Sequence, residues 1–358
     1  MNGKTSCWTI SAAEAFSFSS RLRGALALLV LFMPGCKSPT PFEHYGLALG
    51  TSFAVKASFL PSGVDPEKLK TELEAKLEEV DREMSTYLPD SELSRFNRSA
   101  STDWQPVTPN LAKVVAKALE VSRLSDGAFD VTVGPLVNLW GFGPDARRNQ
   151  APETSAIEAA KARVGYQYLQ ARLSPPALRK LRPELYVDLS AIAKGFAVDY
   201  LAEHLESLGV GDYLVEIGGE VRVKGRSPTG RKWRVAIEKP VPKLSQIEKI
   251  LELSDIAVAT SGDYRNYFEA GGKRFSHTID PRTGWPISHR LASVSVLCST
   301  TMEADALATA LMVLGEEQGF TLAEKEGIPA LFIVKQAEGE FSEKPTSAFL
   351  QTMRRGAL

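Results

Sequence analysis

The stretch AIAKGFAVDYLAEHLESLGVGDYLVEIGGEVRVKG, from Ala191 to Gly225, predicts one helix followed directly by two strands. The helix is expected to stop at Gly209, because glycine is the residue that most often terminates a helix. The two strands lie on either side of Gly218 and Gly219. This order departs from the regular alternation of single strands and helices that builds a parallel sheet.

The rest of the chain shows the same irregular mixture of helices and strands. Asp65 and Pro66 mark the start of an amphipathic helix, as N-cap and first helical residue. Further helices are expected at 108–125, 155–164, 301–315 and 317–327. Strands are expected at 46–60, 184–190, 232–240, 255–264 and 329–335. Residues 134–144 are expected to form a Gly-rich loop. We therefore predict an α+β fold, a single unit of mostly antiparallel strands with packed helices.

Composition and motifs limit the class of protein. Hydrophobic residues make up 44% of the chain and charged residues 24%, which is enough apolar material to bury a core. The net charge of −1 argues against a nucleic-acid partner, since phosphate backbones recruit a basic excess. The sequence has no Gly-x-x-x-x-Gly-Lys loop, no complete Gly-x-Gly-x-x-Gly and no His-Glu-x-x-His. A bound nucleotide would therefore be held by a less common arrangement.

The N-terminal segment has the pattern of a secretory signal. Two arginines precede an apolar run at 25–33, which is too short to span a bilayer as a helix. Cys36 directly follows a glycine and resembles the cysteine of a bacterial lipobox. We expect residues 1–36 to be a lipoprotein signal peptide, Cys36 to be lipidated, and residues 37–46 to be a tether. The protein would then be an exported, membrane-anchored lipoprotein facing the periplasm; a plain cleaved signal is the alternative.

A candidate metal site lies in the helix expected at 301–315. Asp305 and Thr309 are four residues apart, so their side chains lie one above the other on one face of the helix. Both offer oxygen ligands of the kind that Mg²⁺ and Ca²⁺ prefer. The alternative is that Asp305 interacts only with the helix dipole and that Thr309 bonds back to a carbonyl of its own helix.

A candidate anion site lies where residues 184–190 lead into the helix after Ala191. Asp188, Ser190 and Lys194 are close together there. Free N–H groups at a helix N-terminus bind anions, and Lys194 would add a positive charge for a phosphate. The alternative is an N-cap by Ser190 beside an ordinary surface lysine.

Three other stretches have both a functional and an ordinary interpretation. The glycine pair within Glu216–Glu220 lets a backbone approach a flat ligand, or makes a tight hairpin turn. Phe129 and Asp130 can pack on a ring, or serve as a core aromatic and a turn aspartate. Residues 263–265, which end with Arg265, lie near a strand end and can equally form a polar loop.

His277 is one of only four histidines and stands at the entry of a Pro-x-x-Gly turn in SHTIDPRTGWP, residues 276–286. A histidine near its ordinary pKa can take a proton at neutral pH, an effect worth ~10²–10⁴-fold in rate. The residue is therefore either catalytic or part of an ordinary hairpin.

Together and in this order, these stretches resemble one family, the ApbE-type FAD:protein FMN transferases, which are exported lipoproteins that attach FMN to other proteins. The matching pieces are ALGTSF, MSTYLPDSELSRFN, DGAFDVTVGPLVNLWGFG, VDLSAIAKGFAVD, EIGGEVRVKG, ATSGDYRNYF, HTIDPRTG and EADALATALMVLG. They cover nearly the whole chain beyond the tether. The resemblance implies an ApbE-like, T-fold-related catalytic unit, the flavin transferase domain, over residues 47–358.

The resemblance implies FAD as the donor substrate and Mg²⁺ as the metal, with transfer of the FMN half to a Ser or Thr hydroxyl and release of AMP. It implies that His277 is the catalytic group, either as the base or by orienting a phosphate. It also implies that the backbone carbonyl of Ala191 joins Asp305 and Thr309 as a metal ligand. The residues implied in FAD binding are Leu49, Tyr87, Ala128, Phe129, Asp130, Asp188, Lys194, Glu220, Arg265 and His277. Leu49 departs from the family, which often has the more adaptable methionine there.

The resemblance also implies a protein acceptor with a Ser/Thr-Gly-Ala-Ser/Thr core, such as a membrane redox subunit. This chain has no such core, since its nearest stretch, TSGDY, lacks the alanine. One alternative is an FAD pyrophosphatase, in which water attacks in place of the acceptor. The others are a flavin-binding lipoprotein without turnover and a structural envelope lipoprotein, and the presence of His277, Asp305 and Thr309 argues against both.

Overall fold

The computed structural model describes residues 40–144, 150–240, 247–263, 266–337 and 340–355. The expected signal peptide, Cys36 and Arg265 therefore lie outside the described residues. Within these ranges, no helix has both the length and the apolar character needed to cross a bilayer.

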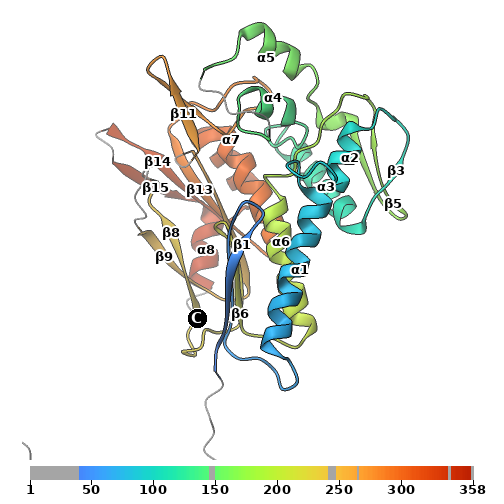
Figure 1. The fold of residues 1–358 in the computed structure, drawn as a ribbon. Helices are drawn as coiled ribbons and strands as arrows, with labels where there is room; N and C mark the ends of the chain where they lie inside the picture. The colour runs from blue at the N-terminus through green and yellow to red at the C-terminus, as the bar shows by residue number, and fades with distance from the viewer. Residues whose placement is uncertain (1–39, 145–149, 241–246, 264–265, 338–339, 356–358) are drawn as a thin grey trace, which may run out of the picture. The chain divides into compact units, whose positions relative to one another are not determined.

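An eight-stranded sheet forms the centre of the fold (Figure 1). Its strands follow the spatial order β1-β2-β6-β7-β10-β13-β14-β15, and every neighbouring pair is antiparallel. Their bounds are β1 Phe42–Ala48, β2 Thr51–Ala57, β6 Tyr213–Ile217, β7 Glu220–Lys224, β10 Ile256–Gly262, β13 Leu291–Cys298, β14 Ala330–Lys335 and β15 Phe341–Pro345. The predicted α+β class with mostly antiparallel strands is confirmed.

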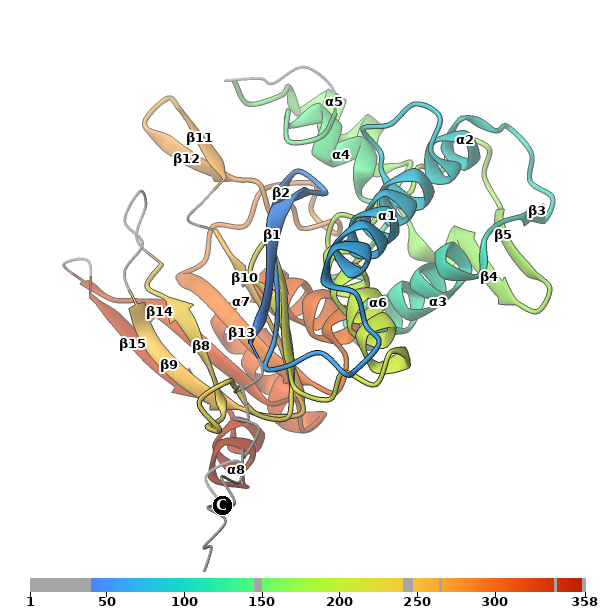
Figure 2. The same cartoon turned by 60° about the horizontal axis from the view of Figure 1, so that its bottom comes forward.

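Helices cover one face of this sheet (Figures 1 and 2). The helices α6 and α7 pack directly on the strands, and α1 and α3 pack on α6 and α7. The helix bounds are α1 Pro66–Met84, α2 Glu92–Arg98, α3 Pro109–Leu124, α4 Gly134–Leu139, α5 Thr154–Lys161, α6 Ala193–Ser207, α7 Thr301–Lys325 and α8 Ser347–Arg355. The large core between helices and sheet uses alternate residues of the strands, for example Phe332 and Val334 of β14.

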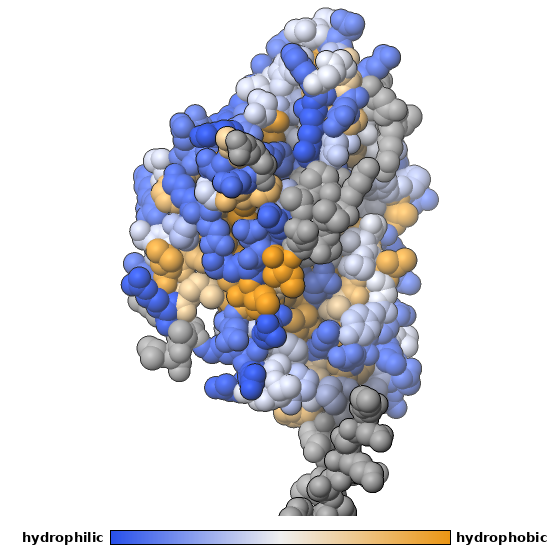
Figure 3. Space-filling model, turned by 90° about the vertical axis from the view of Figure 1, so that its left-hand side faces the viewer, coloured by the Kyte–Doolittle hydropathy of each residue, from blue (hydrophilic) through white to orange (hydrophobic). Residues whose placement is uncertain are grey.

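The other residues of the same strands form a second, smaller core on the opposite face. Leu331 and Ile333 of β14 pack there with the hairpin of β8 (Trp233–Glu238) and β9 (Ile247–Leu253) and with Phe349 of α8. The outer side of this part of the molecule is mostly hydrophilic, with a small hydrophobic patch near its middle (Figure 3). The central strands β13 and β14 are thus buried on both faces, which fits their nearly continuous apolar sequences, whereas the edge strands β1 and β15 are partly exposed.

Two smaller sheets complete the described chain. One has the order β3-β5-β4, from Gln105–Pro106, Pro176–Lys180 and Leu169–Leu173; the short 3₁₀ helix Tyr166–Tyr168 leads directly into β4. The other is the hairpin of β11 (Tyr267–Ala270) and β12 (Lys273–Ser276), which projects from the body of the fold (Figure 2). This hairpin leads directly into His277.

The local signals for helix ends are confirmed. Asp65 caps α1 through its Oδ1, which accepts hydrogen bonds from the backbone N–H groups of Glu67 and Lys68 at 2.9 Å each. The two helices expected at 301–315 and 317–327 are both present within α7, where Gly315 (φ 79°) interrupts the helical backbone.

Four expectations for local structure are wrong. Residues 46–60 form most of a hairpin rather than one strand, because Leu49 and Gly50 make a two-residue turn, and β1 already begins at Phe42 within the expected tether. The expected loop at 134–144 contains the helix α4. The strand expected to close the fold at 329–335 is followed by β15 and α8, which are only five and nine residues long.

The fourth correction concerns residues 184–190, which belong to no strand. The side-chain amide of Asn97 takes the place of a neighbouring strand. Its Oδ1 accepts from the N–H of Val187 and its Nδ2 donates to the carbonyl of Val187, both at 2.8 Å. The N–H of Asp188 donates to the carbonyl of Val131 at 2.7 Å. The segment therefore has strand-like backbone bonds without a partner strand, which the sequence pattern cannot reveal.

Candidate active site

A cavity of about 770 Å³ is lined by the β1–β2 and β6–β7 turns, the start of α6, the first turns of α7 and the segment after β12. Every predicted site residue that the structure describes lies on its wall: Leu49, Tyr87, Ala128, Phe129, Asp130, Asp188, Ala191, Lys194, Glu220, His277, Asp305 and Thr309. These residues come from segments up to 260 positions apart (Leu49 to Thr309). The fold thus brings the whole described set together around one space.

Asp305 lies at the crossing of α6 and α7. Its side chain is 5% exposed, and its Oδ2 accepts a hydrogen bond from the backbone N–H of Gly195 at 3.0 Å. Gly195 permits this contact, because a Cβ there would lie 2.5 Å from the carbonyl oxygen of Thr301. Burial raises the pKa of Asp305 above its ordinary value, and the nearby Lys194 and the Gly195 N–H oppose that rise.

Three oxygens at this crossing have no hydrogen-bond partner in the described part of the chain. Gly195 donates to Asp305, so the carbonyl of Ala191, four residues before Gly195, accepts no backbone bond. The Thr309 hydroxyl makes no bond to its own helix, contrary to the ordinary interpretation of that residue. The second carboxylate oxygen of Asp305 is also unpartnered.

A carboxylate, a hydroxyl and a backbone carbonyl form a set of hard oxygen ligands that fits Mg²⁺. Among the described residues, no group of three or more His, Cys, Asp and Glu side chains could hold a metal ion. A metal at this crossing would therefore keep only one charged protein ligand, and its other positions would be open to phosphate oxygens.

Lys194 and Glu220 form an ion pair beside this crossing. The Nζ of Lys194 lies 2.9 Å from Oε1 of Glu220 and 3.9 Å from Oδ2 of Asp305. Burial raises the pKa of Glu220 to about 7, although Lys194 opposes the rise, and its Oε2 is buried without a partner. The Ser190 hydroxyl donates to Asp188 and does not cap α6, so the start of α6 has no side-chain cap of its own. These contacts exclude an N-cap by Ser190, the ordinary interpretation of this segment.

His277 is oriented by the backbone that precedes it. Its Nδ1 lies 3.0 Å from the carbonyl oxygen of Asn266, and a carbonyl can only accept, so Nδ1 carries the proton. The Nε2 atom is then left with a lone pair that can accept a proton. Burial lowers the pKa of His277 below its ordinary value, an effect that the Asn266 carbonyl partly offsets, so the ring is neutral at pH 7.

The turn after His277 is held by residues of other segments, Trp140 and Ile157. The indole N–H of Trp140 donates to the carbonyl of Gly284 at 2.9 Å, and the N–H of Gly284 donates to the carbonyl of Asp280 at 2.8 Å. Gly284 has φ +82°, and a Cβ there would lie 2.7 Å from Ile157. The Pro-x-x-Gly turn is therefore a rigid support for the His277 segment.

The remaining predicted residues differ in burial and in their hydrogen bonds. Both carboxylate oxygens of Asp130 are engaged, one by the N–H and hydroxyl of Thr132 at 2.7 Å each and one by the N–H of Tyr166 at 2.8 Å. Asp130 thus also has its ordinary turn role. Phe129 is 2% exposed and belongs to the core, whereas Tyr87 is 64% exposed at the edge of the cavity.

Sequence reasoning missed two parts of the site. Residues 234–238 of β8 and 260–262 of β10 line the cavity, but an ordinary alternating strand gives no sign of facing a ligand. Asn266 acts through its carbonyl oxygen, which every residue possesses, so no sequence signal could have identified it.

Leu49 has strained backbone geometry in the wall of the cavity. It is the first residue of the two-residue β1–β2 turn and has φ 51°, with Gly50 at φ 73°. Two positive φ values define a type I′ turn, in which Asn-Gly is favoured and leucine is not. The strain is consistent with a role for the apolar side chain in the cavity.

We expect Leu49→Asn to stabilise the protein by roughly 1 kcal/mol, because asparagine tolerates this backbone conformation. The same change removes an apolar side chain from the cavity wall, so we expect it to weaken FAD binding. Thermal melting and a flavin fluorescence titration measure the two effects. A lower melting temperature would contradict the strain, and an unchanged FAD affinity would contradict the contact.

The model of the ApbE family matches residues 49–332 of the chain. The chain is 49% identical over 326 residues to the FAD:protein FMN transferase of Vibrio cholerae, covering 91% of this chain and 96% of that protein. It is 41% identical to the FAD:protein FMN transferase of Escherichia coli K12, covering 88% and 93%.

Solved structures agree with these similarities. The flavin transferase ApbE of Vibrio cholerae superposes with a TM-score of 0.80 at 47% identity, covering 87% of this chain and 99% of that one. The apo flavinyl transferase ApbE of Pseudomonas stutzeri gives 0.80 at 43% identity, with coverage of 88% and 97%. The similarity thus includes both the sequence and the fold of the domain around the cavity.

Proposed function

Since the chain belongs to the ApbE family, we propose that it is an Mg²⁺-dependent FAD:protein FMN transferase that attaches FMN to a Ser or Thr hydroxyl of a target protein. The observation that carries the proposal is that one cavity is lined by His277, whose Nδ1 is held by the Asn266 carbonyl, and by Ala191, Asp305 and Thr309, which bear the three unpartnered oxygens. A proton acceptor and a site for a divalent cation are the two requirements of attack on a diphosphate.

The reaction breaks the phosphoanhydride bond of FAD and forms a phosphate ester bond to the acceptor. The acceptor oxygen bonds to the phosphorus of the FMN half, the bond from that phosphorus to the bridging oxygen breaks, and AMP leaves with the bridging oxygen. His277 takes the acceptor proton at Nε2. Bound Mg²⁺ would stabilise charge on the phosphate oxygens. Lys194 lies where it adds a positive charge for the same groups.

The test is one incubation of the purified protein with FAD, Mg²⁺ and a domain that bears the Ser/Thr-Gly-Ala-Ser/Thr core, followed by the intact mass of that domain. A gain of one FMN with release of AMP is the expected result. Free FMN and AMP with an unmodified acceptor would instead identify an FAD pyrophosphatase. If FAD is bound but stays unchanged, the protein is either a flavin-binding lipoprotein without turnover or does not act on this acceptor.

The proposal includes export and a lipid anchor, supported by the sequence pattern before Cys36. An anchor would hold the enzyme next to acceptors such as membrane redox subunits that face the periplasm. Cys36→Ala should therefore move the protein from the membrane to the soluble fraction, because one thiol carries the lipid. Fractionation and immunoblotting of both forms measure this, and continued membrane association of the variant would contradict the anchor.

A further inference from the structure

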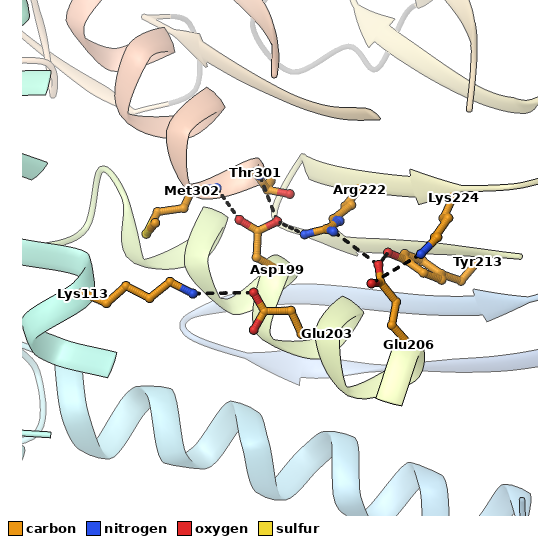
Figure 4. A network of polar contacts seen from close by, with 9 residues as sticks. All are labelled: Lys113, Asp199, Glu203, Glu206, Tyr213, Arg222, Lys224, Thr301 and Met302. Carbon is orange, nitrogen blue, oxygen red and sulfur yellow. Dashed lines mark hydrogen bonds and ion pairs between the residues drawn. The ribbon is translucent and has the colours of Figure 1, made fainter. Parts of the chain in front are cut away.

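Asp199 joins α6 to the start of α7 (Figure 4). Its Oδ1 accepts from the backbone N–H of Thr301 and its Oδ2 from that of Met302, each at 2.9 Å. Asp199 is 4% exposed, and no side chain of α7 itself caps that helix. The carboxylate therefore supplies the N-terminal cap of α7 from a different helix.

A residue of α7 in turn caps the start of α6. Asp305 of α7 accepts from the N–H of Gly195 in the first turn of α6, which also lacks a side-chain cap of its own. Gly195 and Asp199 are one turn apart on α6, and Thr301 and Asp305 are one turn apart on α7. Each helix thus caps the other with a carboxylate. Together the two contacts fix the position of α7 along the axis of α6.

Asp199 is in turn held by the sheet. Arg222 of β7 donates to its Oδ1 at 2.9 Å and lies 3.3 Å from Oε1 of Glu206, which also accepts from the hydroxyl of Tyr213 at 2.6 Å (Figure 4). A carboxylate with three hydrogen bonds, one of them to a guanidinium, has little freedom to move. The network therefore connects the central sheet to the first turn of α7.

We propose that Asp199 is a positioning residue for the metal-binding oxygens: its cap on α7 holds Asp305 against Gly195, which leaves the Ala191 carbonyl and the second Asp305 oxygen open to the cation. Asp199 does not line the cavity and touches no substrate. Its effect is transmitted through the position of α7. The proposal rests on the proposed function, because it concerns the same Mg²⁺ site.

The test compares Asp199→Asn with Glu203→Gln in the purified full-length protein. Asparagine keeps the size of the side chain but cannot accept from Thr301, Met302 and Arg222 together. Glu203 lies one turn further along α6 and pairs at 3.5 Å with exposed Lys113, so its change is a matched control (Figure 4). Calorimetric titration with Mg²⁺ in the presence of FAD gives the metal affinity without any transfer being measured.

We expect Asp199→Asn to weaken Mg²⁺ binding by ~10–100-fold, as is typical for partners of metal ligands, and Glu203→Gln to leave it unchanged. In transfer assays, high Mg²⁺ should restore kcat in Asp199→Asn. If Asp199→Asn only lowers the melting temperature while its Mg²⁺ affinity equals that of the parent, Asp199 has a structural role alone and the proposal is wrong.

Two further comparisons make the test decisive. If Asp199→Asn does not fold, Arg222→Gln loosens the same carboxylate from the sheet and should shift Mg²⁺ affinity in the same direction, and no shift would overturn the proposal. If Asp305→Asn also leaves Mg²⁺ affinity unchanged, the metal site of the proposed function fails rather than the role of Asp199.

Discussion

His277→Ala will leave FAD binding largely intact and reduce the rate of FMN transfer by about 10²–10⁴-fold, the usual contribution of a general base. The expectation rests on the Asn266 carbonyl, which fixes the proton on Nδ1 and leaves Nε2 as the proton acceptor. Intact-mass kinetics of the acceptor and a flavin fluorescence titration measure the two quantities. His204→Ala is the matched control, since His204 pairs with Glu72 and does not line the cavity.

The pH dependence gives an independent check of the same role. Burial lowers the pKa of His277, so the neutral, proton-accepting form persists below the ordinary value of 6.5. The kcat/KM of the parent protein should therefore fall only as the pH drops below about 6.5, and His277→Ala should lack this acidic limb. Transfer at the parental rate in the variant would remove His277 from the chemistry.

The sequence predicted the fold where local chemistry and periodicity agreed. The cap at Asp65 and the break at Gly315 are of this kind, because each follows from one residue and its immediate neighbours. The segment around Val187 was misread because its backbone bonds go to the side chain of Asn97, 90 positions away. A pattern of period two records burial on alternate sides, and it cannot distinguish a strand from a segment held by one amide.

In the candidate site, too, the sequence predicted what depends on neighbouring residues and missed what depends on packing between distant segments. Asp305 and Thr309 were identified from spacing on one helix, and the resemblance supplied the Ala191 carbonyl. The structure adds the reason that this carbonyl is free, namely that the Gly195 N–H is taken by Asp305. That relation depends on how closely two helices approach, which is set by packing and is not encoded in either helix alone.

The second large effect is expected for Asp305→Asn, which should raise the Mg²⁺ concentration needed for transfer by about 10²–10³-fold. Of the three oxygens proposed to bind the metal, only that of Asp305 carries a charge, and the substitution removes it. Asparagine is a sharper replacement than alanine, since its side-chain oxygen can still accept from Gly195. Glu303→Gln is the matched control, because Glu303 lies on the same helix and pairs at 3.9 Å with Lys117. Titration of transfer with Mg²⁺ measures the effect, and an unchanged titration would contradict the metal assignment.

We expect Asp305→Asn to impair Mg²⁺-dependent transfer but to increase the thermal stability of the metal-free protein. This combination distinguishes loss of a metal ligand from damage to the fold. Burial raises the pKa of Asp305, so its charge is unfavourable in the folded, metal-free protein at neutral pH. Replacement by a neutral amide removes that penalty, and Asp305→Asn should therefore melt at a higher temperature than the parent without metal. Mg²⁺ should stabilise the parent by binding only its folded state and should stabilise the variant far less. A variant that melts lower than the parent without metal would show that the carboxylate serves the helix crossing more than the cation.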